Sequence, residues 1–321
     1  MPIARSKLAV PVLLLVCLIW AGAFIGLELG AQPLHAIGLG EFRFEIAALF
    51  LAVRFTLAAL LMPLVLPSGV RRASRYNTLA GALLGLCFSA HLLTQLVGMG
   101  FSDMEPGRAA FLTALFVVFA PLLAYVFLRR KPRTGVLIGI PLAILGVAYI
   151  GGPPSAGLSL AAWLNVAAAA IYGAQIVITD VVTRRGDTMA QTQAMIVVCA
   201  LICWVAFAVS PRAAEFTALP GFADALMDPR FWLSELYLAV ISTVIALALV
   251  NRWQREVSPN HAAILFTSTP VFATIMSIAV GEETVTLWLF FGAGMILLAN
   301  LSAQFIGRKP PAASTVATEK L

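Results

Sequence analysis

Long apolar stretches separated by short polar loops follow one another along this chain from end to end. Each stretch is close to the roughly twenty residues that an α-helix needs to cross the hydrocarbon core of a bilayer. The pattern predicts ten membrane-spanning helices, at about residues 8–30, 46–66, 78–99, 107–128, 134–151, 158–180, 190–210, 233–251, 261–281 and 285–306. The first stretch is too long for the apolar core of a signal peptide, so we expect it to remain as a span.

The two halves of the chain match each other at a constant offset of 153 residues. The matching pairs include Pro106 and Pro259, Ala109 and Ala262, Ala110 and Ala263, Leu112 and Leu265, Phe119 and Phe272, and Gly139 and Gly292. Internal similarity of this kind in a membrane chain is typical of a duplicated half. We therefore expect a first repeat at residues 1–152, a second repeat at 153–307, and a disordered cytoplasmic tail at 308–321.

Basic residues gather in alternate loops, on the side that also carries both termini. That side holds 16 of the 21 Lys and Arg residues, which places both termini in the cytoplasm by the positive-inside rule. Because each half has five predicted spans, the second half must enter the membrane in the opposite sense to the first. The sequence therefore predicts an all-α integral membrane protein with ten transmembrane helices in two five-helix, inverted-topology repeats.

Composition excludes several other classes of protein. Hydrophobic residues make up 61% of the chain and charged residues 11%, whereas soluble domains carry about 25% charged residues. The net charge of +6 lies in the loops of one side, so it does not indicate nucleic-acid binding. No motif for a metal, a nucleotide or a catalytic nucleophile is present, so we expect neither a cofactor nor an enzyme.

Four segments resemble the EamA-type members of the drug/metabolite transporter superfamily. They are residues 18–24, which contain a tryptophan, and residues 54–59, which begin with Arg-Phe like the family's second helix. The other two are residues 107–133, a helix followed by a basic loop, and residues 269–292, which include a Gly-Glu turn. The resemblance implies two EamA repeats in a bacterial inner (plasma) membrane and transport of small metabolites, among which amino acids are a prominent class. Two features depart from it: Arg129–Pro132 replaces the first Gly-Glu turn, and either Arg43 or Arg54 matches the family's second-helix arginine.

Polar and aromatic groups inside the spans are the candidate substrate-binding residues, since such groups tend to face the interior of a bundle. His91 and Gln95 are four residues apart and share a helix face, where they could bind a zwitterion or form an interhelical hydrogen bond. Trp20 and Tyr172 lie at nearly equivalent places in the two halves and could bracket an apolar side chain. Gln175 would add an amide to the same wall, and Trp163 is either part of it or an interfacial residue.

Three further residues are candidates for gating or coupling. Pro270 removes a backbone hydrogen bond and could kink the ninth span. Glu28 and Arg54 are charges inside predicted spans, where an unpaired charge costs at least about 2.5 kcal/mol, and a pair between them would relieve that cost.

These features predict a secondary transporter that works by alternating access, with neutral or aromatic amino acids as the expected substrates and export as the expected direction. The alternatives are efflux of lipophilic drugs, for which Glu28 would be the embedded acid, and an intramembrane enzyme. The expected partners are a small molecule and the lipid bilayer, and no nucleic acid. Proton coupling and the choice between monomer and homodimer stay open.

Overall fold

The computed structural model describes residues 8–38, 40–150, 152, 157–257 and 265–306. The predicted tail at 308–321 and the predicted start of the ninth span at 261–264 lie outside the described residues. Within the described part, eight helical segments are long and apolar enough to cross a membrane, and two apolar helices are shorter.

The long segments comprise both continuous and composite helices. They are α1 (Ala9–Gly38), α2 (Arg43–Val65), α4 (Arg75–Met99), α5 (Pro106–Ala114) with α6 (Phe116–Leu128), α8 (Leu160–Thr183), α9 (Thr188–Ala208), α12 (Pro229–Leu236) with the π-helix η2 (Tyr237–Ile245) and α13 (Ala246–Trp253), and α16 (Leu287–Phe305). The shorter apolar helices are α7 (Thr134–Ile150) and α15 (Thr269–Val280). Short connecting helices are α3 (Ser68–Arg71), α10 (Ala213–Thr217), α11 (Phe222–Met227) and the 3-10 turn η3 (Gln254–Glu256).

Helix boundaries differ from the sequence-based prediction at one functionally important place. The predicted eighth span begins at residue 233, but α12 begins at Pro229. Asp228 accepts a hydrogen bond from the Arg230 amide at 2.8 Å, and proline occupies the first helical turn, where its missing N–H costs nothing. The earlier start places Glu235 six residues into the membrane-spanning segment rather than two.

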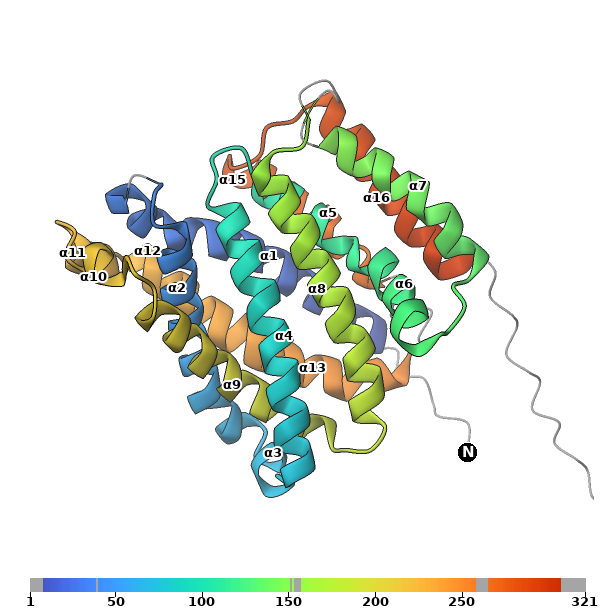
Figure 1. Cartoon of the computed structure of the whole chain (residues 1–321), viewed down its shortest axis with the longest axis horizontal. Coiled ribbons are helices and arrows are strands. Elements are labelled where there is room, and N and C mark those ends of the chain that lie inside the picture. Colours follow the sequence, from blue (N-terminus) through green and yellow to red (C-terminus); the bar gives the residue numbers. More distant parts are fainter. Residues whose placement is uncertain (1–7, 39, 151, 153–156, 258–264, 307–321) are drawn as a thin grey trace, which may run out of the picture.

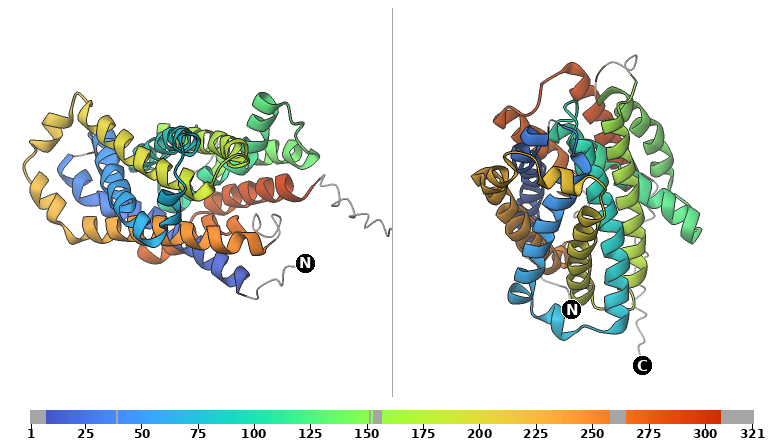
Figure 2. Two further views of the ribbon diagram at one scale, coloured as in Figure 1. Left: turned by 90° about the horizontal axis from the view of Figure 1, so that it is seen from below. Right: turned by 60° about the vertical axis from the view of Figure 1, so that its left-hand side comes forward.

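Helices of one half pack mainly on helices of the other half. In the first half, α1 packs on α12, η2, α13 and α15; in the second half, the equivalent helix α8 packs on α4, α5 and α6. The equivalent helices α2 and α9 contact each other, as do α7 and α16, which lie side by side at one edge (Figure 1). Exchanging the two halves therefore leaves the pattern of contacts nearly unchanged. The short helices α10 and α11 lie together at one end of the molecule (Figure 2).

Glycines bring the backbones of α7 and α16 into direct contact. A Cβ added at Gly135 would lie 2.0 Å from the Ser302 carbonyl oxygen, and one at Gly292 would lie 2.6 Å from the Ile150 backbone. Small residues permit this close approach in a membrane, where packing rather than the hydrophobic effect holds helices together.

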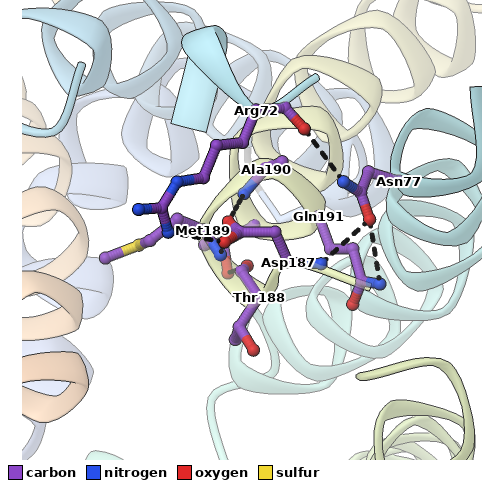
Figure 3. A network of polar contacts seen from close by, with 8 residues as sticks. Arg72, Asn77, Asp187, Thr188, Met189, Ala190 and Gln191 are labelled. Atoms are coloured by element: carbon purple, nitrogen blue, oxygen red, sulfur yellow. Dashed lines mark hydrogen bonds and ion pairs between the residues drawn. The ribbon is translucent and has the colours of Figure 1, made fainter. Parts of the chain in front are cut away.

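Polar networks tie the ends of the α2–α9 pair. At one end, Asp187 caps α9, accepting from the Met189 and Ala190 amides at 3.1 and 3.0 Å, and forms an ion pair with Arg72 at 2.9 Å (Figure 3). The Asn77 side chain donates to the Arg72 carbonyl at 3.0 Å and accepts from the Asp187 amide at 3.1 Å (Figure 3). At the other end, Arg212 pairs with Glu41 at 3.1 Å. Both contacts join loops of different halves.

Candidate functional site

Two spans are interrupted at equivalent positions. In the first half, Leu115 is a turn residue between α5 and α6; in the second, Leu265 and Phe266 are helical, Thr267 and Ser268 form a turn, and α15 follows. Leu115 and Ser268 are separated by the same 153 residues that relate the two halves. Discontinuous helices at corresponding positions expose backbone groups for a ligand and point to the binding site in repeat-built membrane proteins.

The hydrogen bonds at the two interruptions also correspond. The Leu115 amide donates to the Leu112 carbonyl at 3.2 Å, and the Ser268 amide donates to the Leu265 carbonyl at 3.0 Å. On the far side, the Phe119 and Phe272 amides donate to the carbonyls of residues 115 and 268, at 3.0 and 2.9 Å. Pro270 lies in the first turn of α15, where a missing N–H is tolerated. The break therefore precedes Pro270, at residues 267–268, instead of being a kink within a continuous span.

Tyr172 of α8 joins the first interruption to the neighbouring helix α4. Its ring stacks on the His91 ring, with centroids 4.8 Å apart and an interplanar angle of 19°. It also meets Phe116, the first residue of α6, edge-on at 4.9 Å. Phe88 extends the cluster, 6.1 Å from the His91 ring.

Trp20 of α1 makes similar contacts at the second interruption. Its ring lies 5.7 Å from that of Phe266, and its Nε1 donates to the Ser242 carbonyl in η2 at 3.2 Å. Trp20, in the first half, thus connects the interrupted helix of the second half to η2. Tyr172, in the second half, connects the interrupted helix of the first half to α4. The two residues therefore take similar places in the two halves, although their partners are not equivalent at the offset of 153 residues.

His91 and Gln95 both lie at the first interruption, as buried residues on one face of α4. The His91 Nδ1 is 2.9 Å from the Ala168 carbonyl oxygen. Because a carbonyl oxygen can only accept, this nitrogen carries a proton, and in the neutral ring Nε2 is then an acceptor. The Gln95 Nε2 donates to Thr113 Oγ1 of α5 at 2.7 Å.

Two other predicted wall residues lie apart from this cluster. Trp163 is 56% exposed on the outside of the bundle, so the structure does not bring it to Tyr172 and His91. Gln175 is buried, and its Nε2 donates to the Met195 sulfur of α9 at 3.7 Å. Its amide therefore faces α9.

The π-helix η2 is tied to α1 by its own Tyr237 side chain and to α2 by the Arg54 side chain. The Tyr237 hydroxyl donates to the Ile19 carbonyl at 2.7 Å, and Arg54 Nε and Nη2 donate to Thr243 Oγ1 at 3.3 and 3.1 Å. The Thr243 hydroxyl in turn donates to the Leu238 carbonyl at 2.7 Å, five residues earlier. π-Helical turns occur frequently at functional sites, where they displace a helix face by one residue.

Arg54 and Glu28 do not form the predicted pair. Arg54 is buried against η2. The carboxyl group that interacts with it electrostatically is that of Glu235. Glu28 instead lies near Glu282, in the turn before α16. Sequence analysis missed Glu235 because the predicted span 233–251 places this residue at the very end of the span, where a carboxyl can reach the membrane surface.

A polar cluster joins the start of α5 to the turn between α15 and α16. Arg108 pairs with Glu105 at 3.0 Å and with Glu283 at 3.4 Å, and the Gly107 amide donates to Glu283 at 2.8 Å. Thr284 donates to Glu105 at 2.8 Å. Burial raises the pKa of Glu283 to about 8, and the neighbouring Glu105 carboxylate shifts it in the same direction.

Beside this cluster lies a cavity of about 310 Å³. Arg108, Leu112, Ser159 and Ala162 are among its lining residues. Leu112 precedes the Leu115 interruption by about one helical turn. The cavity therefore lies beside the polar cluster, between α5 and the start of α8.

The Glu283 carboxyl should make stability depend on pH. Between its ordinary value of 4.5 and its folded value of about 8, the folded protein holds a proton that the unfolded chain releases. The free energy of unfolding should therefore fall as the pH rises through this range. Thermal unfolding in detergent should show this slope in the wild type and a flatter slope in Glu283→Gln. Glu215→Gln, at an exposed carboxyl, is the control and should keep the wild-type slope; an unchanged slope in Glu283→Gln would contradict the assignment.

Trp20→Phe should weaken the second interruption while preserving an aromatic ring. The variant loses the hydrogen bond to the Ser242 carbonyl, which is worth about 0.5–1.5 kcal/mol. We expect transport to fall by about two- to tenfold, as each 1.4 kcal/mol is a factor of ten. Initial rates in proteoliposomes check this, and a wild-type rate would show that the contact has no functional role.

Comparison with known proteins agrees with this architecture. The EamA-like transporter family matches residues 7–152 and 159–302, which gives two repeats. A protein described as an uncharacterized transporter from Archaeoglobus fulgidus is 25% identical over 288 residues, covering 89% of this chain and 82% of that protein. A probable terminal-alkyne amino-acid exporter from Streptantibioticus cattleyicolor is 32% identical over 169 residues, covering 51% of this chain and 52% of the exporter.

A solved crystal structure shares the fold, with a TM-score of 0.53 and 15% sequence identity, over 96% of this chain and 100% of that one. The helical structure, the apolar spans and the two matched repeats thus confirm the resemblance found in the sequence. They identify a multi-pass membrane protein and a transporter. The chain belongs to the EamA-like transporter family.

Proposed function

We propose that this transporter exports neutral or aromatic amino acids across a bacterial inner membrane by alternating access. In this proposal, ten spans form two inverted five-helix repeats, at residues 1–152 and 153–307, with both termini in the cytoplasm. The observation that carries the proposal is the pair of helix interruptions at Leu115 and Ser268, each joined to the opposite half by an aromatic residue. Rocking one half against the other would move the two interruptions relative to each other and open the site on alternate sides.

The chemistry of the interruptions suits a zwitterion. The His91 Nε2 lone pair can accept a hydrogen bond from a substrate ammonium group. The N-termini of α6 and α15, which follow the two interruptions, carry the positive ends of their helix dipoles and favour a carboxylate. The rings of Tyr172, Phe116 and Trp20 provide apolar surface for a substrate side chain.

The partial match to an amino-acid exporter supports this substrate class and direction. Efflux of lipophilic drugs is the second candidate, and the observation that favours it is the half-buried carboxyl of Glu28 within α1. The cluster of Glu105, Arg108 and Glu283 would close the non-cytoplasmic end, beside the 310 Å³ cavity.

Counterflow in proteoliposomes that contain only this protein tests the proposal. Vesicles preloaded with an unlabelled neutral or aromatic amino acid should accumulate the labelled compound, and protein-free vesicles should not. His91→Ala should lose this activity. Correctly folded protein that exchanges no amino acid, but transports lipophilic cations, would favour the drug-efflux candidate.

A further inference from the structure

Glu235 is a fully buried carboxyl inside a membrane-spanning segment, with 0% of its surface exposed. It lies six residues after the start of α12, which corresponds to about 9 Å along the helix axis. In the described part of the chain, neither of its carboxyl oxygens has a hydrogen-bond partner. It follows Phe231 by one turn and precedes Leu238, both of which are also fully buried.

An ionised carboxylate in such surroundings costs several kcal/mol unless a cation pairs with it. The titratable groups on the helices packed against α12 are Cys17, Glu28 and His35 on α1, Arg43, Glu45 and Arg54 on α2, Asp224 on α11, and Tyr237 on η2. Among them, the group whose charge acts on Glu235 is the Arg54 guanidinium.

The other groups have different neighbours. Glu28 lies near Glu282, and His35 lies near Arg43. The Arg43 side chain donates to the Gly100 carbonyl, and the Cys17 thiol donates to the Leu265 carbonyl. Glu45 accepts a hydrogen bond from Ser210, Asp224 is exposed, and the Tyr237 hydroxyl donates to the Ile19 carbonyl. Glu235 therefore has one electrostatic partner, on the neighbouring helix α2.

In this structure, Arg54 does not reach Glu235. Its Nε and Nη2 donate instead to Thr243 of η2, and the described residues contain no ion pair within 4.0 Å between Arg54 and Glu235. Thr243 is two turns beyond Glu235 along the same composite helix. Because these two partners are about 12 Å apart along the helix, exchanging one for the other needs the Arg54 side chain to reorient as α12 and η2 shift along α2.

We propose that Glu235 is a proton-binding site, with Arg54 as the group that releases the proton. When Arg54 binds Thr243, Glu235 keeps its proton and is neutral. When Arg54 moves to Glu235, the O–H bond breaks, the proton leaves to water, and the carboxylate pairs with the guanidinium. Because η2 also accepts the Trp20 hydrogen bond, the same shift would reach the second interruption. The coupling of this step to transport rests on the proposed function, whereas proton binding itself does not.

Infrared titration of the purified wild-type protein tests proton binding without any substrate. A band from a buried protonated carboxyl should be present at low pH and disappear as the pH rises. One component of this band should be lost in Glu235→Gln and kept in Glu45→Gln, which alters a buried carboxyl that has a hydrogen-bond partner. Glu283→Gln, which removes the other carboxyl that holds a proton in this range, should leave that component in place. Arg54→Met should extend the band to higher pH. A wild type without such a band, or a Glu235→Gln variant that retains it in full, would overturn the proposal.

Flux measurements test the coupling separately. An imposed pH gradient should drive uptake of labelled amino acid into wild-type vesicles, and this response should fall at least about tenfold in Glu235→Gln. If the response is lost in Glu28→Gln but not in Glu235→Gln, the coupling belongs to Glu28, and the proposed coupling role of Glu235 is wrong. If the Glu235 band titrates but the protein exchanges no amino acid, the proposed substrate is wrong, whereas the proton-binding site is still supported.

Discussion

Tyr172→Ala is expected to reduce amino-acid exchange by about ten- to a hundredfold. The variant loses the stacked contact with His91 at 4.8 Å and the edge-on contact with Phe116 at 4.9 Å. Each aromatic pair is worth about 0.5–1.5 kcal/mol beyond its buried area, and each 1.4 kcal/mol is a factor of ten. Initial counterflow rates, normalised to the amount of folded protein, measure the effect.

Two controls separate this effect from a general disturbance of α8. Tyr172→Phe keeps the ring that makes both contacts and should retain most of the activity. Trp163→Ala truncates a larger ring on the same helix, but one that is 56% exposed on the outside, and should transport at the wild-type rate. Equal losses in Tyr172→Ala and Trp163→Ala would mean that the aromatic cluster has no specific role.

Gly135→Ala is expected to destabilise the protein strongly, by separating α7 from α16. The new Cβ would lie 2.0 Å from the Ser302 carbonyl oxygen and 2.7 Å from that of Ile306. Both are backbone atoms, so no side-chain rotation can relieve the clash. Overpacking of this kind costs about 1–3 kcal/mol or more. Thermal unfolding in detergent should show a midpoint several degrees below that of the wild type.

Gly294→Ala is the matched control, because Gly294 lies in α16 and a Cβ added there meets no atom within 4 Å among the described residues. Alanine is a better helix former than glycine by about 1 kcal/mol. This variant should therefore unfold at the wild-type temperature or slightly above it. Equal midpoints for the two variants would contradict the close backbone contact between α7 and α16.

The spans and the repeat could be predicted from sequence, since the length of apolar runs and a constant offset are local patterns. The start of α12 was misplaced because its signal is a cap, Asp228 followed by Pro229, and not hydropathy. The second interruption has a nearby proline, Pro270, as a signal. The first has none: Leu115 is apolar, with neither glycine nor proline beside it. Only the offset of 153 residues from Ser268 could have indicated it.

The candidate site was only partly predictable, because its contacts join distant parts of the chain. Helical periodicity could have excluded Trp163 from the wall: it precedes Tyr172 by nine residues, which at 100° per residue places the two on opposite faces. No local pattern could place Arg54 against Thr243 rather than Glu28. That choice depends on how α2 packs on η2.

Accessibility of the two interruptions decides whether they form the transport pathway. Leu115→Cys and Ser268→Cys would be made separately in a background that lacks Cys17, Cys87, Cys199 and Cys203, and labelled with a membrane-impermeant thiol reagent from each side of the membrane. We predict that both positions react, that the favoured side changes with the substrate gradient, and that bound substrate slows both reactions at least about fivefold. If neither position reacts from either side, or if substrate protects neither, the interruptions do not line the pathway.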